Sequence, residues 1–407
     1  MDKTVKRHIL LLISITILAK LLLIAFLAAI PVDYVGGLLG IPPDDLYHNL
    51  RVMNITERPL KEKLGYTFDS QWYVQMSQKG YPPKGPGYGN FIPNPFYFDK
   101  SNCVYWWPFL YPLLIRIFSL FMDPIISGLL LTNAASLLAV ALFYLVSVRY
   151  VNPSDAFKAS VLLMMYPFNL AAWTCSYTEP IFLVFALLAW ITLHKDKIVW
   201  SGFFMMLASL IRFPGLMLFP ILTVIYFRGN MRGVEKWTLL KRVIILNLFA
   251  LPILYWMLIQ VPASTGVSVH LLRTICGRYT KYSPLPYASD GGIVGLLATY
   301  INLLISSSTV MSTFGVAYFF AYFALLATYS LRNLDKRLML YSLGFMLFHL
   351  LVIGAADSLG RYLGVIWPLF IYYGRRLDSM DVFFFSAVFM GLGLVLLELH
   401  TNMILVF

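Results

Sequence analysis

The sequence predicts an all-α polytopic membrane protein, and three observations support this fold class. First, the 407-residue chain is 59% hydrophobic and only 12% charged, whereas a soluble domain carries about twice that charged fraction. Second, apolar runs of roughly 20 residues, the length that crosses a bilayer as a helix, recur from one end of the chain to the other. Third, lysines and arginines stand between these runs, so the net charge of +12 is a signal of membrane topology rather than of nucleic-acid binding.

The apolar runs predict about eleven transmembrane helices in one membrane domain that covers residues 1–407. The first run is too long for the core of a signal peptide and lacks a cleavage site of small residues, so we expect it to be retained as a helix. The predicted spans are 9–30, 125–148, 157–175, 178–193, 198–212, 214–227, 243–260, 309–330, 338–356, 362–374 and 382–399.

The distribution of positive charge predicts the orientation of these spans. If Lys3, Lys6 and Arg7 are cytoplasmic, more than half of the 31 lysines and arginines fall in short loops on the same side of the membrane. Residues 31–124 then form a large first outer loop, and residues 261–295 form a second one. The basic residues of the first loop do not conflict with this orientation, because long loops translocate largely regardless of their charge.

One hydrophobic segment of the first outer loop, YWWPFLYPLLIRIFSLFM (residues 105–122), is long enough to span the membrane. Counting it as a span would place the positive charge of all later loops outside. Pro108, Pro112 and the charge of Arg116 favour a helix that lies in the membrane interface instead. We therefore predict an interfacial helix here.

The polar stretch TFDSQWYVQMSQKGYP, residues 67–82, carries the first candidate for catalysis. Asp69, Trp72, Tyr73 and Met76 share one face at helical spacing, and a Gly-Tyr-Pro sequence ends the predicted helix. Two interpretations of the aspartate are open. It is either an N-cap that accepts backbone N–H groups, or a general base, for which a carboxylate desolvated by apolar rings is suited.

Two further charged residues lie at the predicted outer ends of spans. Glu179, in the sequence SYTEP, stands between two helices, where it is either a charge at a helix start or a site residue. Arg212 stands where the spans 198–212 and 214–227 meet, in a hairpin that we expect to turn near the outer surface. An arginine so close to hydrocarbon is costly and usually marks a site or a buried partner.

Two pairs of polar residues complete the set of candidates. His270 and Arg273 share one face of an amphipathic outer segment, although a single histidine in such a position is often structural. Asp357 and Arg361 are four residues apart, so they either form a local ion pair near a helix end or contribute to a site.

The sequence lacks the motifs that bind nucleotides or metals. It contains no P-loop, GxGxxG or HExxH motif, and the three cysteines have no metal-binding spacing. Asp44 and Asp45 are adjacent and follow two prolines, which favours a turn. We therefore expect no metal and no cofactor. An outer cavity with carboxylates and arginines suits an anionic, lipid-linked substrate, because arginine pairs with phosphate in a bidentate way.

Several segments resemble, in the same order, the PIG-V family of mannosyltransferases, which add the second mannose in GPI-anchor assembly, and its prokaryotic relatives in the GT-C superfamily. Phe68 stands where the family usually has tryptophan, and Met76-Ser77 stand where it has Ile-Ala, but the aspartate is retained. The matching segments, which together span most of the chain, are FDSQWYVQMSQKGYP, WWPFLYPLL, YPFNLAAWTCSYTEPIFLVFALLAW, ASLIRFPG and GRYLGVIWPLF.

The resemblance implies a GT-C-like fold and an inverting, metal-independent glycosyltransferase, with mannose as the implied sugar, on the extracytoplasmic side of the membrane, either the ER lumen or a prokaryotic exterior. The donor would be a polyprenyl-phosphate sugar such as dolichyl-phosphate mannose, and the acceptor a glycan, a glycolipid or a lipid-linked molecule. The acceptor's identity and the presence of a partner subunit stay open. By this resemblance Asp69 would be catalytic, and the substrate-binding residues would be Trp72, Tyr73, Glu179, Arg212, His270, Arg273, Asp357 and Arg361.

Two other classes of membrane protein fit parts of the sequence. A lipid or solute transporter, or a scramblase, would also have intramembrane charges and broken helices. It would, however, predict an inverted repeat and charges near the midplane, whereas the charges here gather at one face. A membrane O-acyltransferase would need a histidine deep in a span, and His349, in a plain hydrophobic run, is the one candidate.

Overall fold

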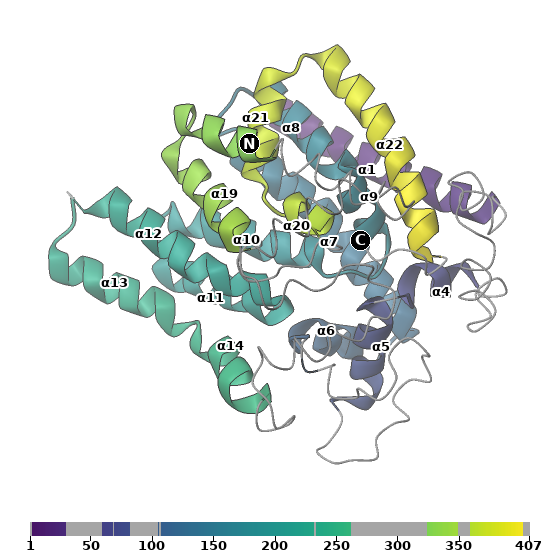
Figure 1. Cartoon of the computed structure of the whole chain (residues 1–407), viewed down its shortest axis with the longest axis horizontal. Coiled ribbons are helices and arrows are strands. Elements are labelled where there is room, and N and C mark those ends of the chain that lie inside the picture. The colour runs from purple at the N-terminus through teal and green to yellow at the C-terminus, as the bar shows by residue number, and fades with distance from the viewer. Residues whose placement is uncertain are drawn as a thin grey trace, which may run out of the picture.

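The computed structural model describes residues 2–29, 59–67, 69–81, 105, 107–231, 233–261, 324–348 and 359–401. The elements in these ranges are helices (Figure 1), which agrees with the predicted all-α class. In chain order they are α1 (Lys3–Ala29), α4 (Leu60–Gly65), α5 (Asp69–Lys79), α6 (Leu110–Phe118), α7 (Pro124–Ser147), α8 (Pro153–Met165), α9 (Pro167–Thr174), α10 (Glu179–Leu193), α11 (Ile198–Ile211), η3 (Phe213–Met217), α12 (Leu218–Asn230), α13 (Lys236–Leu248), α14 (Leu251–Tyr255), the π-helix η4 (Trp256–Gln260), η5 (Leu331–Asn333), α19 (Lys336–Phe348), α20 (Leu359–Gly364), α21 (Pro368–Arg376) and α22 (Ser379–Thr401).

Several of these helices are apolar and long enough to cross a membrane. In the described part of the chain, α1, α7 and α22 meet this condition as single helices. Two bent pairs each add one candidate span: α9 with α10, which meet at 111°, and α13 with α14 and η4, which meet at 46°. The structure thus supports a membrane protein with three to five such spans in its described residues, whereas about eleven were predicted.

Only some of the predicted spans are accounted for by these helices. The predicted spans 198–212 and 214–227 correspond to the shorter helices α11 and α12, and two others are divided where the chain starts a new helix at a proline. The predicted span 157–175 is divided into α8 and α9 at Pro167, and the predicted span 362–374 is divided into α20 and α21 at Pro368. Proline has no backbone N–H and favours the first turn of a helix, so each proline begins a helix instead of continuing one. The predicted spans 309–330 and 338–356 lie partly outside the described residues, as does the loop 31–124, and of the second outer loop 261–295 only Val261 is described.

The segment 105–122 contains the short helix α6. Its nine residues rise only about 14 Å, less than half of a bilayer core. Tyr111 and Ile115 are buried against the protein, while Leu113, Ile117 and Phe118 are exposed. This one-sided burial fits the predicted interfacial helix.

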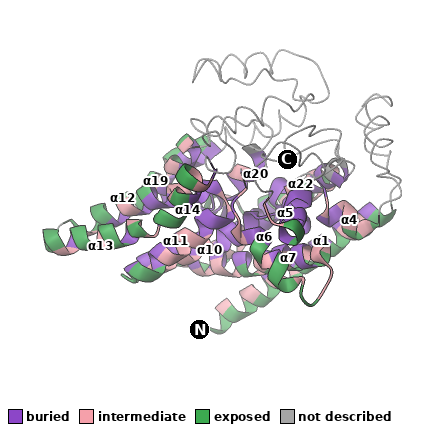
Figure 2. Ribbon diagram, turned by 90° about the horizontal axis from the view of Figure 1, so that it is seen from below, coloured by how far each residue is buried: buried purple, intermediate pink, exposed green. Residues whose placement is uncertain are grey.

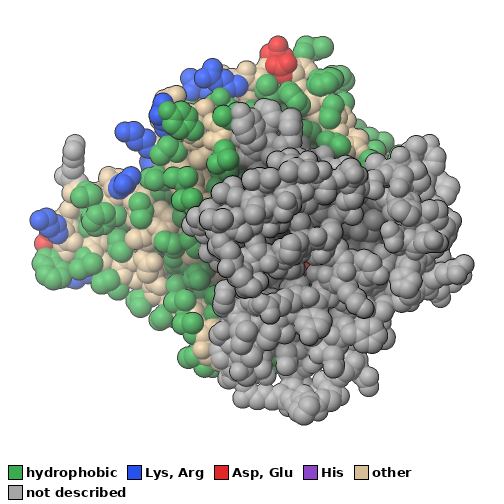
Figure 3. All heavy atoms as spheres, viewed as in Figure 1, with side chains coloured by type: hydrophobic (Ala, Val, Ile, Leu, Met, Phe, Trp, Pro, Cys, Tyr) green, Lys and Arg blue, Asp and Glu red, His purple; other side chains and the backbone are tan. Residues whose placement is uncertain are grey.

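The helix ends that carry the predicted cytoplasmic charges lie together at one end of the molecule, here called the basic end. The side chain of His8, near the start of α1, hydrogen-bonds the Tyr144 hydroxyl near the end of α7 at 2.8 Å. Arg242 of α13 pairs with Asp196, which follows α10, at 2.7 Å. Figure 3 shows lysine and arginine side chains along one edge, from the turn between α12 and α13 to the turn between α21 and α22. Helices α4, α5 and α6 lie away from this edge (Figure 1).

The interior between the helices is filled by large aromatic side chains. Trp190 of α10, Tyr341 of α19 and Trp367, just before α21, are fully buried. The rings of Trp190 and Trp367 lie 5.1 Å apart between centroids, and those of Tyr341 and Trp367 lie 5.2 Å apart. Figure 2 shows buried residues on the inner faces and exposed residues along the outer faces of α1 and α13. Many of the exposed residues are leucine or phenylalanine, such as Leu10 and Phe383, as expected of helices that face lipid.

Candidate functional site

Asp69 is the first residue of α5, the helix predicted from the polar stretch 67–82. The helix runs to Lys79, and Gly80 follows with a φ of +74°, a conformation that favours glycine and stops helices. Residues 70–77 are all buried, so α5 is enclosed on every side rather than on the single face that the sequence predicted. The helix lies inside the protein, and its first residue points at a cluster of charges.

The N-cap interpretation of Asp69 is not supported, because another residue closes the turn into α5. The backbone N–H of Thr67 donates to Ser70 Oγ at 3.0 Å, and the Ser70 hydroxyl donates to the Thr67 carbonyl. Among the described residues, the carboxylate of Asp69 accepts from Arg361 and from no backbone N–H group. The pattern resembles half of a capping box, with serine rather than aspartate as the side chain that reaches back.

Glu179 begins α10 immediately after the sharp bend from α9. The bend of 111° places the carboxylate at the turn instead of along a helix face. The position favours an anion, because the unpaired N–H groups of a helix start carry partial positive charge. The side chain is only 1% exposed, so the carboxylate is removed from solvent.

Arg212 lies at the predicted hairpin, where α11 ends and η3 begins. Its backbone is extended, and Gly215 then packs directly on the backbone of Ala208 and Ser209. A Cβ at this glycine would come within 2.5 Å of the Ala208 carbonyl carbon, so glycine is required for the close return of the chain. This return directs Arg212 toward the start of α10.

The four charged residues Asp69, Glu179, Arg212 and Arg361, here called the ion-pair cluster, come together from α5, α10, the end of α11 and α20. Arg361 Nη1 lies 3.1 Å from Asp69 Oδ2 and 3.4 Å from Glu179 Oε1. Arg212 Nη1 contacts Glu179 Oε1 and donates to Thr178 Oγ1 at 3.0 Å. Arg361 is therefore shared by the two carboxylates, and Glu179 is shared by the two arginines.

Burial differs strongly within the ion-pair cluster. The side chains of Glu179, Arg361 and Arg212 are 1%, 3% and 11% exposed, while that of Asp69 is 20% exposed. Two positive and two negative groups balance, which makes burial of four charges tolerable, because a buried charge is costly unless it is paired. Asp69 is the most exposed member of the cluster.

Two tyrosines complete the surroundings of the arginines. The guanidinium carbon of Arg361 lies 4.8 Å from the ring centroid of Tyr177, and that of Arg212 lies 5.3 Å from the ring centroid of Tyr362. Such cation–π contacts hold each guanidinium in a defined orientation. The sequence analysis missed both tyrosines, although they stand in the SYTEP and GRY segments that carried the charged candidates.

One acceptor of the cluster is left without a partner in the described part of the chain. Glu179 Oε2 is buried and receives no hydrogen bond there, while Oε1 contacts both arginines. A buried carboxylate oxygen without a donor is costly and in native proteins calls for an explanation. A hydroxyl group of a bound substrate would satisfy it.

The structure gives Trp72 and Tyr73 packing roles beside the cluster. Trp72 stacks on Trp107 with centroids 5.7 Å apart, and Tyr73 meets the ring of Tyr111 edge-on at 5.0 Å. Burial raises the pKa of the Tyr73 phenol well above its ordinary value, and the negative charge of Asp69 raises it further. Tyr73 therefore stays protonated and is a potential hydrogen-bond donor, not a base.

Three of the predicted site residues are not placed. His270, Arg273 and Asp357 lie outside the described residues, as does His349. The suggested local pair of Asp357 with Arg361 is therefore untested; within the described residues, Arg361 contacts carboxylates that are distant in the sequence. Among the described residues, no group of three or more histidine, cysteine, aspartate or glutamate side chains is placed to hold a metal ion.

A buried lysine supports the turn that carries Glu179. Lys20, in the middle of α1, donates to Asn133 Oδ1 at 2.8 Å, to Ser136 Oγ at 2.6 Å and to the Trp173 carbonyl at 2.7 Å. The carbonyls at the end of a helix have no partner within that helix. Lys20 therefore joins α1 and α7 to the last turn of α9, directly before Cys175 and the bend.

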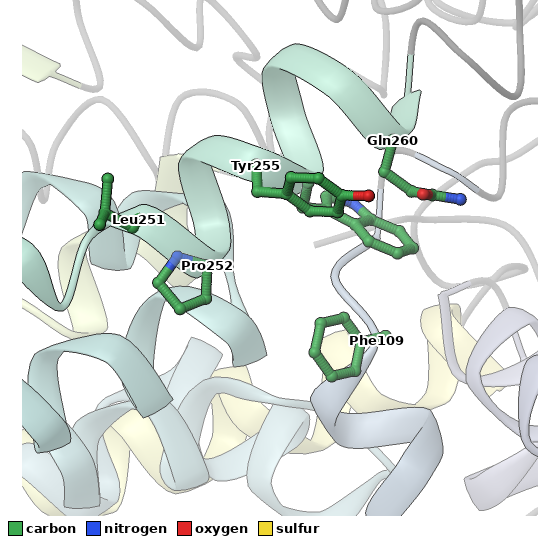
Figure 4. A pocket seen from close by; sticks show the side chains of 6 residues that line it. Phe109, Leu251, Pro252, Tyr255 and Gln260 are labelled. Carbon is green, nitrogen blue, oxygen red and sulfur yellow. The ribbon is translucent and has the colours of Figure 1, made fainter.

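A separate apolar pocket of about 550 Å³ lies beside α14. Figure 4 shows Phe109 facing the ring of Tyr255 and the side chain of Gln260 across it. Its lining is almost entirely hydrocarbon, so it suits an apolar chain rather than a charged group. The lining residues are Phe109, Leu251, Pro252, Tyr255, Trp256 and Gln260.

Comparison of the chain with protein-family models, with curated proteins and with solved structures found no match. The described part of the chain is all-α, and several of its helices are apolar and suited to a membrane. The ion-pair cluster and the sequence motifs are the features that bear on a narrower function.

Proposed function

We propose that this protein is a membrane glycosyltransferase that moves a hexose, by resemblance mannose, from a polyprenyl-phosphate sugar to a glycan, glycolipid or lipid-linked acceptor. The observation that carries the proposal is the position of Asp69, the most accessible carboxylate in a cluster that also holds Arg212 and Arg361. A carboxylate that accepts a proton and arginines that hold a phosphate are the two chemical requirements of this transfer.

The reaction is a direct displacement at the anomeric carbon. The oxygen of the acceptor hydroxyl bonds to that carbon while its proton passes to Asp69. The bond from the anomeric carbon to the phosphate oxygen breaks, and its electron pair stays on the phosphate. Attack from the face opposite the leaving group inverts the configuration.

The arginines account for the fate of the leaving group. The polyprenyl phosphate departs as an anion with more charge than the donor carried, so paired guanidinium groups stabilise the product side of the displacement. Arg212 and Arg361 reach the same carboxylate, Glu179, and therefore lie close enough to act on one phosphate. The unpaired Oε2 of Glu179 is suited to accept a hydroxyl of the bound sugar.

The placement of the cluster supports an active site near one membrane surface. The cluster forms at the ends of α10 and α11 that are remote from the basic end, where Asp196 follows α10. If the basic end is cytoplasmic, as the positive-inside rule predicts, the reaction takes place on the extracytoplasmic side.

The test is the release of polyprenyl phosphate from a donor labelled in its lipid, in membranes that contain the full-length protein and supply the acceptor. We expect Asp69→Asn to reduce release by roughly 10²-fold or more, because an amide cannot take the proton. Asp123→Asn is the matched control, since Asp123 pairs with Lys61 outside the cluster, and it should keep the activity.

A folded Asp69→Asn variant that transfers sugar at the wild-type rate would rule out Asp69 as the base. A transporter or scramblase would move the labelled lipid between leaflets without releasing polyprenyl phosphate from it, so the same assay separates the two classes.

A further inference from the structure

We infer that Asp69 and the phosphate of the donor compete for Arg361, so that donor binding releases Asp69 from its ion pair. The inference rests on the proposed function for the identity of the anion. It adds a property of the site that the displacement itself does not require, namely that the base is held by an arginine until the donor arrives.

The ion-pair cluster is already balanced in charge before an anion binds. Arg361 is 3% exposed and already faces two carboxylate oxygens, at 3.1 Å from Asp69 and 3.4 Å from Glu179. With Arg212 included, the cluster is neutral. A phosphate that enters beside Arg361 brings a third anion into a region with little water, where like charges repel strongly. One of the carboxylates has to give up its contact.

The contacts of the two carboxylates decide which one moves. Glu179 is 1% exposed and is also held by Arg212, which is itself fixed by Thr178. The side chain of Asp69 is 20% exposed, and within the described residues it accepts one hydrogen bond, from Arg361. Asp69 is therefore the carboxylate with fewer restraints and the greater exposure.

The hydrogen bonds that cap α5 do not involve the Asp69 side chain and so do not restrain its movement. Ser70, not Asp69, closes the turn from Thr67 into the helix. The Asp69 side chain can consequently leave Arg361 without breaking the hydrogen bonds that start α5. Had Asp69 been the N-cap, its displacement would have destabilised the helix that carries it.

The release of Asp69 from Arg361 affects its proposed role as the base. A carboxylate oxygen that accepts from a guanidinium is not free to accept the proton of a substrate hydroxyl. Once phosphate occupies Arg361, Asp69 loses this partner and its carboxylate can turn toward the acceptor. Donor binding thus precedes and enables proton abstraction from the acceptor.

The experiment measures binding of farnesyl phosphate and of inorganic phosphate to the purified full-length protein in detergent, by isothermal titration calorimetry. We expect Asp69→Asn to bind phosphate roughly tenfold more tightly than wild type, the effect of removing a competing charge-assisted hydrogen bond. Asp69→Ala, measured in parallel, excludes an effect of a new amide contact with Arg361.

Glu179→Gln is the matched control, because it removes the same charge from the same cluster. It should bind phosphate no more tightly than wild type, since Glu179 holds both arginines in place. Asp123→Asn, outside the cluster, should leave the affinity unchanged.

The possible results distinguish competition for Arg361 from the proposed class of donor. If wild type binds phosphate but Asp69→Asn and Asp69→Ala bind it no more tightly, the competition is refuted and the proposed donor stands. Equal tightening in Asp69→Asn and Glu179→Gln would also refute it, because net charge alone would then explain the effect. Tighter binding of farnesyl phosphate alone supports competition by a lipid-linked phosphate, and tighter binding of both ligands supports competition by the phosphate group itself. No phosphate binding by any variant would overturn the proposed donor class.

Discussion

At the scale of single residues, the sequence left two roles open for Asp69, that of a helix cap and that of a general base. At the start of α5, the capping role belongs to Ser70. Ser70 Oγ accepts from the Thr67 backbone and its hydroxyl donates to the Thr67 carbonyl, while the carboxylate of Asp69 faces Arg361. The aspartate is therefore available for chemistry because its neighbour performs the structural task.

Ser70→Ala is accordingly predicted to destabilise the protein. The substitution leaves the Thr67 N–H without its acceptor in a buried turn, which costs about 1 kcal/mol. Thermal unfolding in detergent should show a lower midpoint for Ser70→Ala than for wild type. Ser119→Ala is the control, because the Ser119 hydroxyl donates to the Arg116 carbonyl at an exposed helix end. Equal midpoints for the two variants would contradict the capping role.

At the scale of elements, the position of Glu179 depends on how α9 ends. Lys20 of α1 and Asn133 of α7 both reach the last carbonyls of α9, at Trp173 and Thr174. A lysine inside an apolar helix is tolerated where such partners satisfy it. Lys20 faces the protein interior, with 6% of the residue exposed.

Lys20→Met is predicted to loosen the turn between α9 and α10. The Trp173 carbonyl loses its donor, which costs about 1–3 kcal/mol for a buried group, and the turn residue Cys175, now fully buried, becomes accessible. The measurement is labelling of Cys175 by a membrane-permeable maleimide in a Cys103→Ser, Cys276→Ser background.

Lys158→Met serves as the control for this labelling. Lys158 also donates to a backbone carbonyl, that of Leu377, but it does so near the basic end. This variant should leave Cys175 unreactive. Unchanged labelling in Lys20→Met would show that the lysine does not hold the turn.

At the scale of the whole molecule, the helices separate a basic end from the end that carries the ion-pair cluster. The basic end contains the pairs Arg242–Asp196 and His8–Tyr144. The opposite end contains the pair Asp69–Arg361. Exposed apolar residues lie on helices between these ends, for example Leu10 and Leu18 on α1. This arrangement is suited to a membrane with the basic end in the cytoplasm.

The orientation is tested by two matched substitutions, Lys61→Cys near the cluster end and Lys236→Cys at the basic end, both in exposed positions. In intact vesicles with the cytoplasmic side inward, an impermeant maleimide should label Lys61→Cys before lysis and Lys236→Cys only after it. Labelling of both from the same side would refute the orientation and with it the placement of the site.

Much of the local structure could be predicted from the sequence. The helix from Asp69 to the Gly80 stop, the turn at Arg212 and the short helix within 105–122 were all expected and are present. Glycine, proline and apolar periodicity act over a few neighbouring residues, so they can be recognised without a partner segment. The count of about eleven spans is not confirmed, because two predicted spans lie partly outside the described residues and others are short helices or are divided where Pro167 and Pro368 begin new helices.

Composition and periodicity are properties of neighbouring residues, so they suffice to predict a helical chain suited to a membrane, with charged residues at the ends of its helices. How those charges pair depends on contacts between helices that are distant in the chain. Arg361 lies 292 positions from Asp69 and still contacts it at 3.1 Å, while Glu179 joins Arg361 to Arg212. The physical reason is that burial requires each charge to have a partner, and the packing of α5, α10, α11 and α20 determines which partner is within reach.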